Sequence, residues 1–136
     1  RTYLLRLAVV DALGRSASRT IGRVLVPVDD RARGVGRRGA WRAVSHPTAW
    51  RGTLSRGARG AAMRVRLGAG RPVVLVRPGS RAARVELRSG GGRTVARIPA
   101  GARARQLRAP AQRRSGPVEL RVLSGTMHVD GIGLAP

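Results

Sequence analysis

The side chains that could perform acid–base chemistry are few and far apart in this chain. Its 136 residues include 2 histidines, 6 acidic residues and no cysteine. His46 and His128 are separated by more than half of the chain and have no carboxylates at ligand-like spacing, so we expect ordinary surface or loop histidines. Glu86 and Glu119 occupy outward positions in alternating segments, where arginines two residues away predict salt pairing rather than the facing acids of a glycoside hydrolase. We therefore predict no catalytic residues and no enzyme activity.

Three aspartates could offer oxygen ligands to a cation such as Ca²⁺. Asp29 and Asp30 lie together in a polar stretch, and Asp130 lies in the last alternating segment. The formal net charge of +22 opposes the capture of a cation, and a chain without cysteine has no thiolate ligands. We predict no metal and no cofactor, and we expect Asp130 to accept a hydrogen bond from a turn or to pair with an arginine.

The aromatic side chains that could form a sugar platform are Trp41, Trp50 and Tyr3, because the apolar face of a sugar ring stacks on an aromatic ring. The chain contains only 2 tryptophans, 1 tyrosine and no phenylalanine. Trp41 and Trp50 are therefore the candidate glycan-binding residues. The alternative is that both are core or strand-edge anchors, since a tryptophan buries a large area in either place.

Arginine is the most prominent source of binding chemistry. All 28 basic residues are arginines, and this excess should attract polyanions such as acidic glycans or nucleic acid. A nucleic-acid binder usually combines a focused basic patch with stacking aromatic rings or a recognition helix, and neither pattern is present. A solvated surface is the alternative to polyanion binding. The candidate polyanion-binding residues are Arg37, Arg38, Arg103, Arg105, Arg113 and Arg114.

The segments that must position these side chains alternate between apolar and polar residues. This period of two predicts strands with one buried face. Turn signals separate the segments, which favours short antiparallel strands in a sandwich or barrel. The alternating apolar residues are Met63, Val65, Leu67, Val85, Leu87, Val118, Leu120, Val122, Met127 and Val129, and the turn signals are Pro78-Gly79-Ser80, Gly90-Gly91-Gly92, Gly116-Pro117 and Ser124-Gly125.

The organisation of the chain changes near residue 30. Residues 1–30 read as a β-hairpin, residues 31–39 as a linker, and residues 40–136 as a sandwich of about nine strands. An isolated hairpin is marginal in water, so this one must pack on the sandwich, belong to a truncated preceding domain, or pair with another molecule. The residues expected to line strands used for assembly are Tyr3, Leu5, Leu7, Val9, Val24 and Val26.

Two stretches carry a resemblance to known families. The first 30 residues, with Tyr3, the turn from Asp11 to Gly14 and a closing strand, resemble the last two strands of an immunoglobulin-like or fibronectin type III-like domain of a secreted bacterial protein. The remainder resembles the jelly-roll modules, galactose-binding-like or carbohydrate-binding, of actinobacterial surface proteins. That likeness rests on Trp41, Trp50, Gly52-Thr53 and the closing run Val129-Asp130-Gly131-Ile132. The resemblance implies an all-β antiparallel sandwich and an extracellular or cell-surface setting.

Two functions of different classes follow. The main hypothesis is a non-enzymatic structural or adhesion module, a homo-oligomer or filament whose N-terminal strands are added to the sheet edge of a neighbouring copy. The alternative is a carbohydrate-binding module that anchors a secreted protein to acidic polysaccharide or cell-wall glycan. Binding of polyanions or nucleic acid through surface arginines is less favoured. The sequence contains no stretch of about 20 apolar residues, so we predict no membrane-spanning segment.

Overall fold

The chain folds into antiparallel β-sheets, as the alternating sequence predicts. The computed structural model describes residues 2–25, 28–101 and 103–135, and side-chain exposure is described for residues 10–17, 28–101 and 103–135. In these residues the only helical turn is η1, a 3₁₀ turn at Trp50–Gly52. No helix among them is long and apolar enough to cross a membrane.

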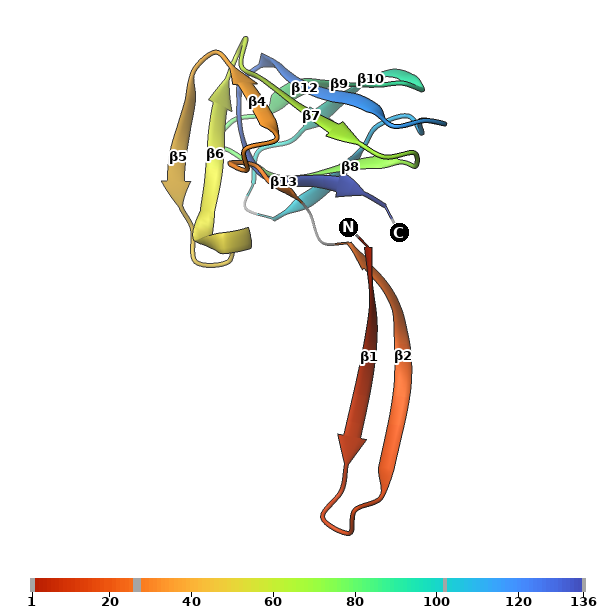
Figure 1. Ribbon diagram of the computed structural model, residues 1–136. Helices are drawn as coiled ribbons and strands as arrows, with labels where there is room; N and C mark the ends of the chain where they lie inside the picture. Colours follow the sequence, from red (N-terminus) through yellow and green to blue (C-terminus); the bar gives the residue numbers. More distant parts are fainter. Residues whose placement is uncertain (1, 26–27, 102, 136) are drawn as a thin grey trace.

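Thirteen strands form three sheets within the described residues. The order β10-β9-β12-β7-β4 makes a five-stranded sheet, and β11-β8-β13-β6-β5, with β3 paired to β13, makes a six-stranded sheet. Figure 1 shows these two sheets as the layers of a sandwich. The bounds are β1 Thr2–Val10, β2 Ser16–Leu25, β3 Val28–Asp29, β4 Val35–Arg38, β5 Trp41–Ser45, β6 Thr53–Ala58, β7 Ala62–Leu67, β8 Pro72–Pro78, β9 Ala83–Ser89, β10 Gly92–Ile98, β11 Arg105–Arg108, β12 Gly116–Ser124 and β13 Thr126–Leu134.

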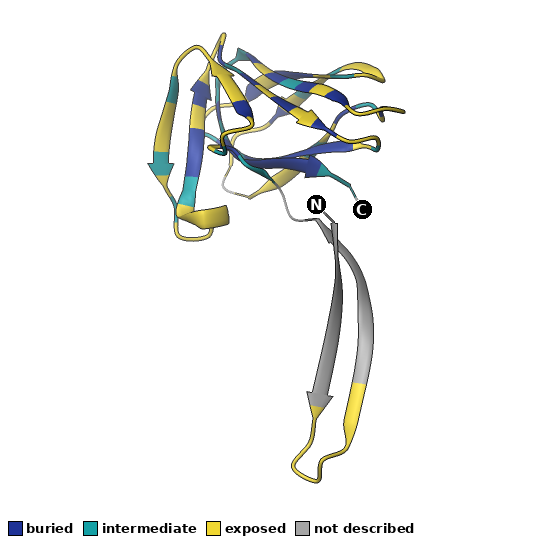
Figure 2. Cartoon of the chain, in the orientation of Figure 1, coloured by how far each residue is buried: buried dark blue, intermediate teal, exposed yellow. Residues whose placement is uncertain are grey.

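The core lies between the two larger sheets. Every second residue of β7, β9 and β12 is buried there, and the residues between them are exposed or half-buried apart from Glu86, so the predicted alternation is confirmed in these strands. Figure 2 shows this as alternating buried and exposed bands along the strands. In β13 the alternation extends only to Val129, because Val129 to Gly133 are all buried. Burying a Val, Leu or Met side chain contributes about 1.5–3 kcal/mol relative to leaving it exposed. The predicted core residues Met63, Val65, Leu67, Val85, Leu87, Val118, Leu120, Val122, Met127 and Val129 are all buried.

Three predicted features differ from the structure. The hairpin predicted over residues 1–30 ends earlier, because Val28–Asp29 form β3 and pair with β13 of the six-stranded sheet. Strand β4 lies within the stretch predicted as a linker and pairs with β7 at the edge of the five-stranded sheet. Only Val35 of this strand is buried, so its alternation is too short to recognise in the sequence. Gly116-Pro117, predicted as a turn, opens β12, whereas the other three turn signals do fall between or at the ends of strands.

Strands β1 and β2 form a separate two-stranded sheet. Figure 1 shows this hairpin extending away from the sandwich. Its turn is held by Asp11, whose Oδ1 accepts hydrogen bonds from the backbone N–H groups of Leu13 and Arg15, both at 2.9 Å. The predicted hairpin is therefore present, and its likeness to an immunoglobulin-like domain remains a prediction.

Candidate functional site

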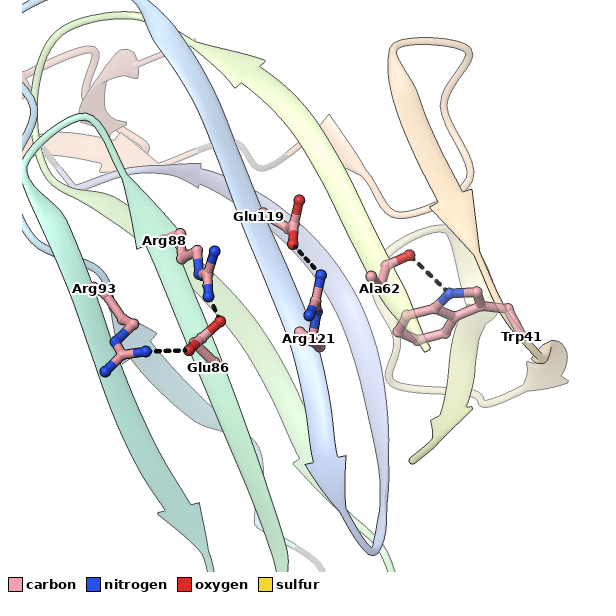
Figure 3. Close-up of polar contacts among 7 residues, drawn as sticks. All are labelled: Trp41, Ala62, Glu86, Arg88, Arg93, Glu119 and Arg121. Carbon is pink, nitrogen blue, oxygen red and sulfur yellow. Dashed lines mark hydrogen bonds and ion pairs between the residues drawn. The ribbon is translucent and has the colours of Figure 1, made fainter. Parts of the chain in front are cut away.

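Trp41 closes one side of the sandwich. Its indole N–H donates to the carbonyl oxygens of Arg38, at 3.0 Å, and Ala62, at 3.1 Å, although Trp41 itself lies on β5 of the other sheet. The ring also lies against β6, because a Cβ placed on Gly57 would be 2.5 Å from a ring carbon. Figure 3 shows the indole directed at β7. This geometry makes Trp41 an anchor between the two sheets.

Trp50 lies in a loop and is 41% exposed. Its backbone N–H donates to Oδ1 of Asp130 at 2.7 Å, which confirms the hydrogen bond expected between Asp130 and a turn. The next residue, Arg51, has a left-handed backbone conformation, with φ of 56°, that side chains other than glycine rarely adopt. The Asp130 carboxylate thus fixes a strained turn that presents an aromatic ring to solvent.

A second contact holds the same loop against the six-stranded sheet. Nη2 of Arg77 on β8 donates to the carbonyl oxygen of Thr48 at 3.1 Å and to its hydroxyl oxygen at 2.9 Å. The backbone N–H of Thr48 also donates to Nδ1 of His46 at 3.3 Å. The loop from residue 46 to residue 52 is therefore held at Thr48 by β8 and at Trp50 by β13 of the six-stranded sheet.

An open hollow of about 560 Å³ lies between His46 of this loop and the turn after β8, on the outer face of the six-stranded sheet. His128 alternates with the core residues Met127 and Val129, so it faces outward. Across the strands it pairs with Arg56 on β6 and Arg77 on β8. The hollow is lined by Val44, His46, Leu54, Arg77, Pro78, Gly79, Ser80, Gly101 and His128.

Both histidines of the chain line this hollow: His46 is a loop residue and His128 lies on the outer surface of β13, so each is a loop or surface histidine as expected, but the two share one site. The only sequence signal was the outward position of His128, and separation along the chain concealed its proximity to His46. Burial, followed by the positive charge of Arg56, lowers the pKa of His128. A neutral imidazole both donates and accepts hydrogen bonds, which suits hydroxyl groups as partners.

The glutamates lie on the outer face of the five-stranded sheet (Figure 3). Glu86 pairs with Arg88 at 2.6 Å and with Arg93 at 3.4 Å, and Glu119 pairs with Arg121 at 3.3 Å. The predicted salt pairing is confirmed. The hydrogen bond from Arg88 lowers the pKa of Glu86, so this carboxylate stays ionised and is poorly suited to act as a general acid.

The predicted aspartate cluster has an unusual member. Asp30 is fully buried, and neither of its carboxylate oxygens has a hydrogen-bond partner. Burial is the main reason that the pKa of Asp30 is raised to about 7. Asp29 differs, because it accepts a hydrogen bond from the backbone of Arg31 and lies 3.8 Å from Nη1 of Arg51. Among the described side chains, no group of three or more His, Asp or Glu could hold a metal ion.

The remaining predicted site residues do not converge. Arg37 and Arg38 lie on β4, at one edge of the five-stranded sheet. The other four candidate arginines are exposed at the start of β11, just before it, and in the turn before β12 (Arg105, Arg103, Arg113 and Arg114). Of the predicted assembly residues, five lie on β1 or β2 and Val26 lies outside the described residues (Tyr3, Leu5, Leu7, Val9 and Val24).

The sandwich is similar to solved carbohydrate-active proteins, although no protein-family model and no curated protein sequence matches the chain. The CBM36-1 domain of a multidomain xylanase from the hindgut metagenome of Trinervitermes trinervoides has a TM-score of 0.57 and 13% identity, over 79% of this chain and 93% of that chain. An exo-β-1,3-galactanase of Phanerochaete chrysosporium, solved with β-1,3-galactotriose, has a TM-score of 0.56 and 15% identity, over 92% of this chain and 32% of its own.

A third similar structure contains the CBM51-2 domain, in complex with GlcNAc, and the INT domains of Clostridium perfringens ZmpB. It has a TM-score of 0.51 and 12% identity, over 97% of this chain and 37% of that chain. The chain thus spans about a third of the galactanase and nearly all of the CBM36-1 domain. At these identities the likeness shows the fold alone, an antiparallel jelly-roll-like sandwich of the kind found in carbohydrate-binding modules.

Proposed function

We propose that this chain is a non-catalytic carbohydrate-binding module whose ligand occupies the hollow beside His128. The observation that carries the proposal is the meeting of two histidines and an arginine over an apolar floor on a sandwich of this fold. The setting we propose is extracellular, where such a module would anchor a larger protein to a glycan. This is the alternative weighed from the sequence, and it now replaces self-association as the preferred function.

The lining of the hollow matches the two kinds of surface on a sugar. Val44 offers an apolar contact to the C–H face of a ring, above a floor formed by the buried Leu54 and Pro78, and His46 and His128 offer ring nitrogens to hydroxyl groups. Arg77 contributes a positive charge, and the Nε of its guanidinium is buried without a hydrogen-bond partner. Because Arg77 also holds Thr48, the loop and the hollow are positioned by the same side chain.

A glycan array carrying neutral and acidic saccharides tests this proposal. The protein should bind at least one saccharide class, and His128→Ala should weaken that binding by about ten-fold, the equivalent of 1.4 kcal/mol. Trp50→Ala is the matched comparison, because Trp50 lies in the same loop but does not line the hollow. Loss of binding in Trp50→Ala with His128→Ala unaffected would move the site to the exposed indole and contradict the hollow.

The hairpin supports a second candidate function, self-association. Strands β1 and β2 pair only with each other among the described strands, and a two-stranded sheet alone is marginally stable in water. Pairing with a neighbouring copy would satisfy the open edges of this sheet. On this basis a surface fibre or layer is the assembly we would expect.

Deletion of residues 1–25, which removes β1 and β2 but keeps β3 in the six-stranded sheet, tests self-association directly. If the hairpin joins copies, the full chain should form dimers or longer polymers in analytical ultracentrifugation, and the shortened chain should be a folded monomer. A full chain that stays monomeric at millimolar concentration would contradict self-association while leaving the carbohydrate-binding proposal intact.

A further inference from the structure

The outer face of the five-stranded sheet is an array of arginines that carbohydrate binding in the hollow does not use. The strand register brings these residues to one side of the sheet: Arg64 and Arg88 are both opposite Glu119, Arg88 is opposite Arg93, and Arg84 is opposite Arg97. We call this surface the arginine face. Its members are Arg38, Arg64, Arg66, Arg84, Arg88, Arg93, Arg97 and Arg121.

The arginine face carries a large excess of positive charge that its own carboxylates do not cancel. Its acidic residues are Glu86 and Glu119, which pair with Arg88, Arg93 and Arg121 (Figure 3). Glu86 is nearly buried, with 5% exposure, so its charge lies beneath the guanidinium groups rather than beside them. The other five arginines have no carboxylate within ion-pair distance among the described residues (Arg38, Arg64, Arg66, Arg84 and Arg97).

The spacing of the charges is regular, because a sheet sets it. Neighbouring strands lie about 4.8 Å apart, and side chains on one face of a strand repeat every two residues, about 6.7 Å. Arg64 and Arg66 on β7 are therefore about 6.7 Å apart, and Arg93 and Arg97 on β10, with Val95 between them, are about 13 Å apart, intervals comparable to the length of one and of two monosaccharide units. A guanidinium presents a planar fork that fits a carboxylate or a sulfate through two hydrogen bonds.

We propose that the arginine face binds a linear acidic polysaccharide, with its carboxylate or sulfate groups on the arginine rows, as a second surface distinct from the hollow. The side chains of this face are all described and include no aromatic ring, whereas proteins that bind single-stranded nucleic acid stack bases on such rings. Among the residues whose structure is described, no helix lies on this face to enter a duplex groove. The arginine face therefore offers charge complementarity to a flexible polyanion, without the features that recognise nucleic acid.

The test uses the full chain with polygalacturonate and chondroitin sulfate as probes, and with dextran as the neutral polymer. The variant Arg64→Gln, Arg66→Gln, Arg84→Gln, Arg97→Gln should weaken binding of at least one acidic probe by about ten-fold or more at 150 mM salt. The matched control Arg103→Gln, Arg105→Gln, Arg113→Gln, Arg114→Gln removes the same net charge from other elements and should weaken binding less than about three-fold. The uronate and sulfate probes distinguish which anionic group is preferred.

Loss of binding in a variant can result from misfolding, but a gain of binding cannot, so a variant expected to bind more tightly completes the test. Glu119→Gln removes a negative charge from the arginine face and releases Arg121, so affinity for the acidic probe should rise about two- to three-fold. Equal losses in the two quadruple variants would overturn the proposal and leave only diffuse attraction to net charge. A duplex or single-stranded DNA of equal charge that binds as tightly, with the same variant dependence, would also overturn it.

The proposal for the hollow and the proposal for the arginine face can be tested independently of each other. His128→Ala should leave binding of the acidic probes unchanged, because His128 lies on the six-stranded sheet. Loss of acidic-probe binding in His128→Ala would place the acidic polysaccharide in the hollow and contradict a second surface. Dextran binding at the same strength as the acidic probes would contradict the role of charge.

Discussion

Replacing Trp41 by alanine is expected to lower the free energy of unfolding by about 3 kcal/mol. The indole packs against the core, its N–H donates to Arg38 and Ala62 in the other sheet, and its ring covers Gly57. Alanine would remove the packing and both hydrogen bonds together. Urea unfolding followed by far-UV circular dichroism measures the change.

Two further variants separate the parts of this effect. Trp41→Phe keeps an aromatic ring but loses the N–H donor. The lost hydrogen bonds should lower the free energy of unfolding by about 1 kcal/mol, in addition to the effect of the smaller ring. Gly57→Ala should also destabilise, since the added methyl group would lie against the Trp41 ring. Trp50→Ala is the matched control, and its exposed ring should change stability by less than about 1 kcal/mol. Equal effects at both tryptophans would contradict the assignment of Trp41 as the anchor.

Replacing Asp30 by asparagine is expected to stabilise the protein in a pH-dependent way. Asp30 is buried without a hydrogen-bond partner, and burial raises its pKa from 3.8 to about 7 in the folded state. Between these two values the folded state binds more protons than the unfolded state, so stability falls as the pH rises through this window. Each pKa unit corresponds to about 1.4 kcal/mol, which sets a ceiling of about 4 kcal/mol on the penalty, complete above pH 7.

The measured quantity is the difference in unfolding free energy between Asp30→Asn and the wild type. This difference should grow by about 2–4 kcal/mol from pH 4 to pH 8, because asparagine has no proton to lose. Comparing the two pH values cancels any constant cost of burying the amide. Asp11→Asn is the control: Arg15 lowers the pKa of the exposed Asp11, so its pH trend should be small and of opposite sign. A difference that stays constant with pH would contradict a raised pKa at Asp30.

The architecture could be predicted because alternation survives in the sequence wherever a strand is long. Met63, Val65 and Leu67 face the core, and the intervening arginines face solvent. Strand β4 escaped prediction because Val35 is its only buried residue. Asp30 was assigned to the end of the predicted hairpin, and its burial could not be foreseen, since burial of an isolated aspartate leaves no pattern in the residues around it.

The candidate site was harder to predict than the fold. His46 and His128 come from a loop and from the last strand, and only the order of strands in the six-stranded sheet brings them together. The clusters of arginines predicted from the sequence to bind polyanions lie on separate elements and do not form one surface. The arginines on the outer face of the five-stranded sheet are spread over five strands with one or two on each, so the strand register was needed to show that they share a surface.

An NMR titration with the best-binding saccharide of the glycan array tests the central claim most directly. If the hollow is the carbohydrate site, the largest amide shifts should cluster at Val44, His46, Leu54, Arg77 and His128, and should saturate with the ligand. The absence of shifts with every saccharide on the array, or saturable shifts confined to residues distant from the hollow, would contradict the claim.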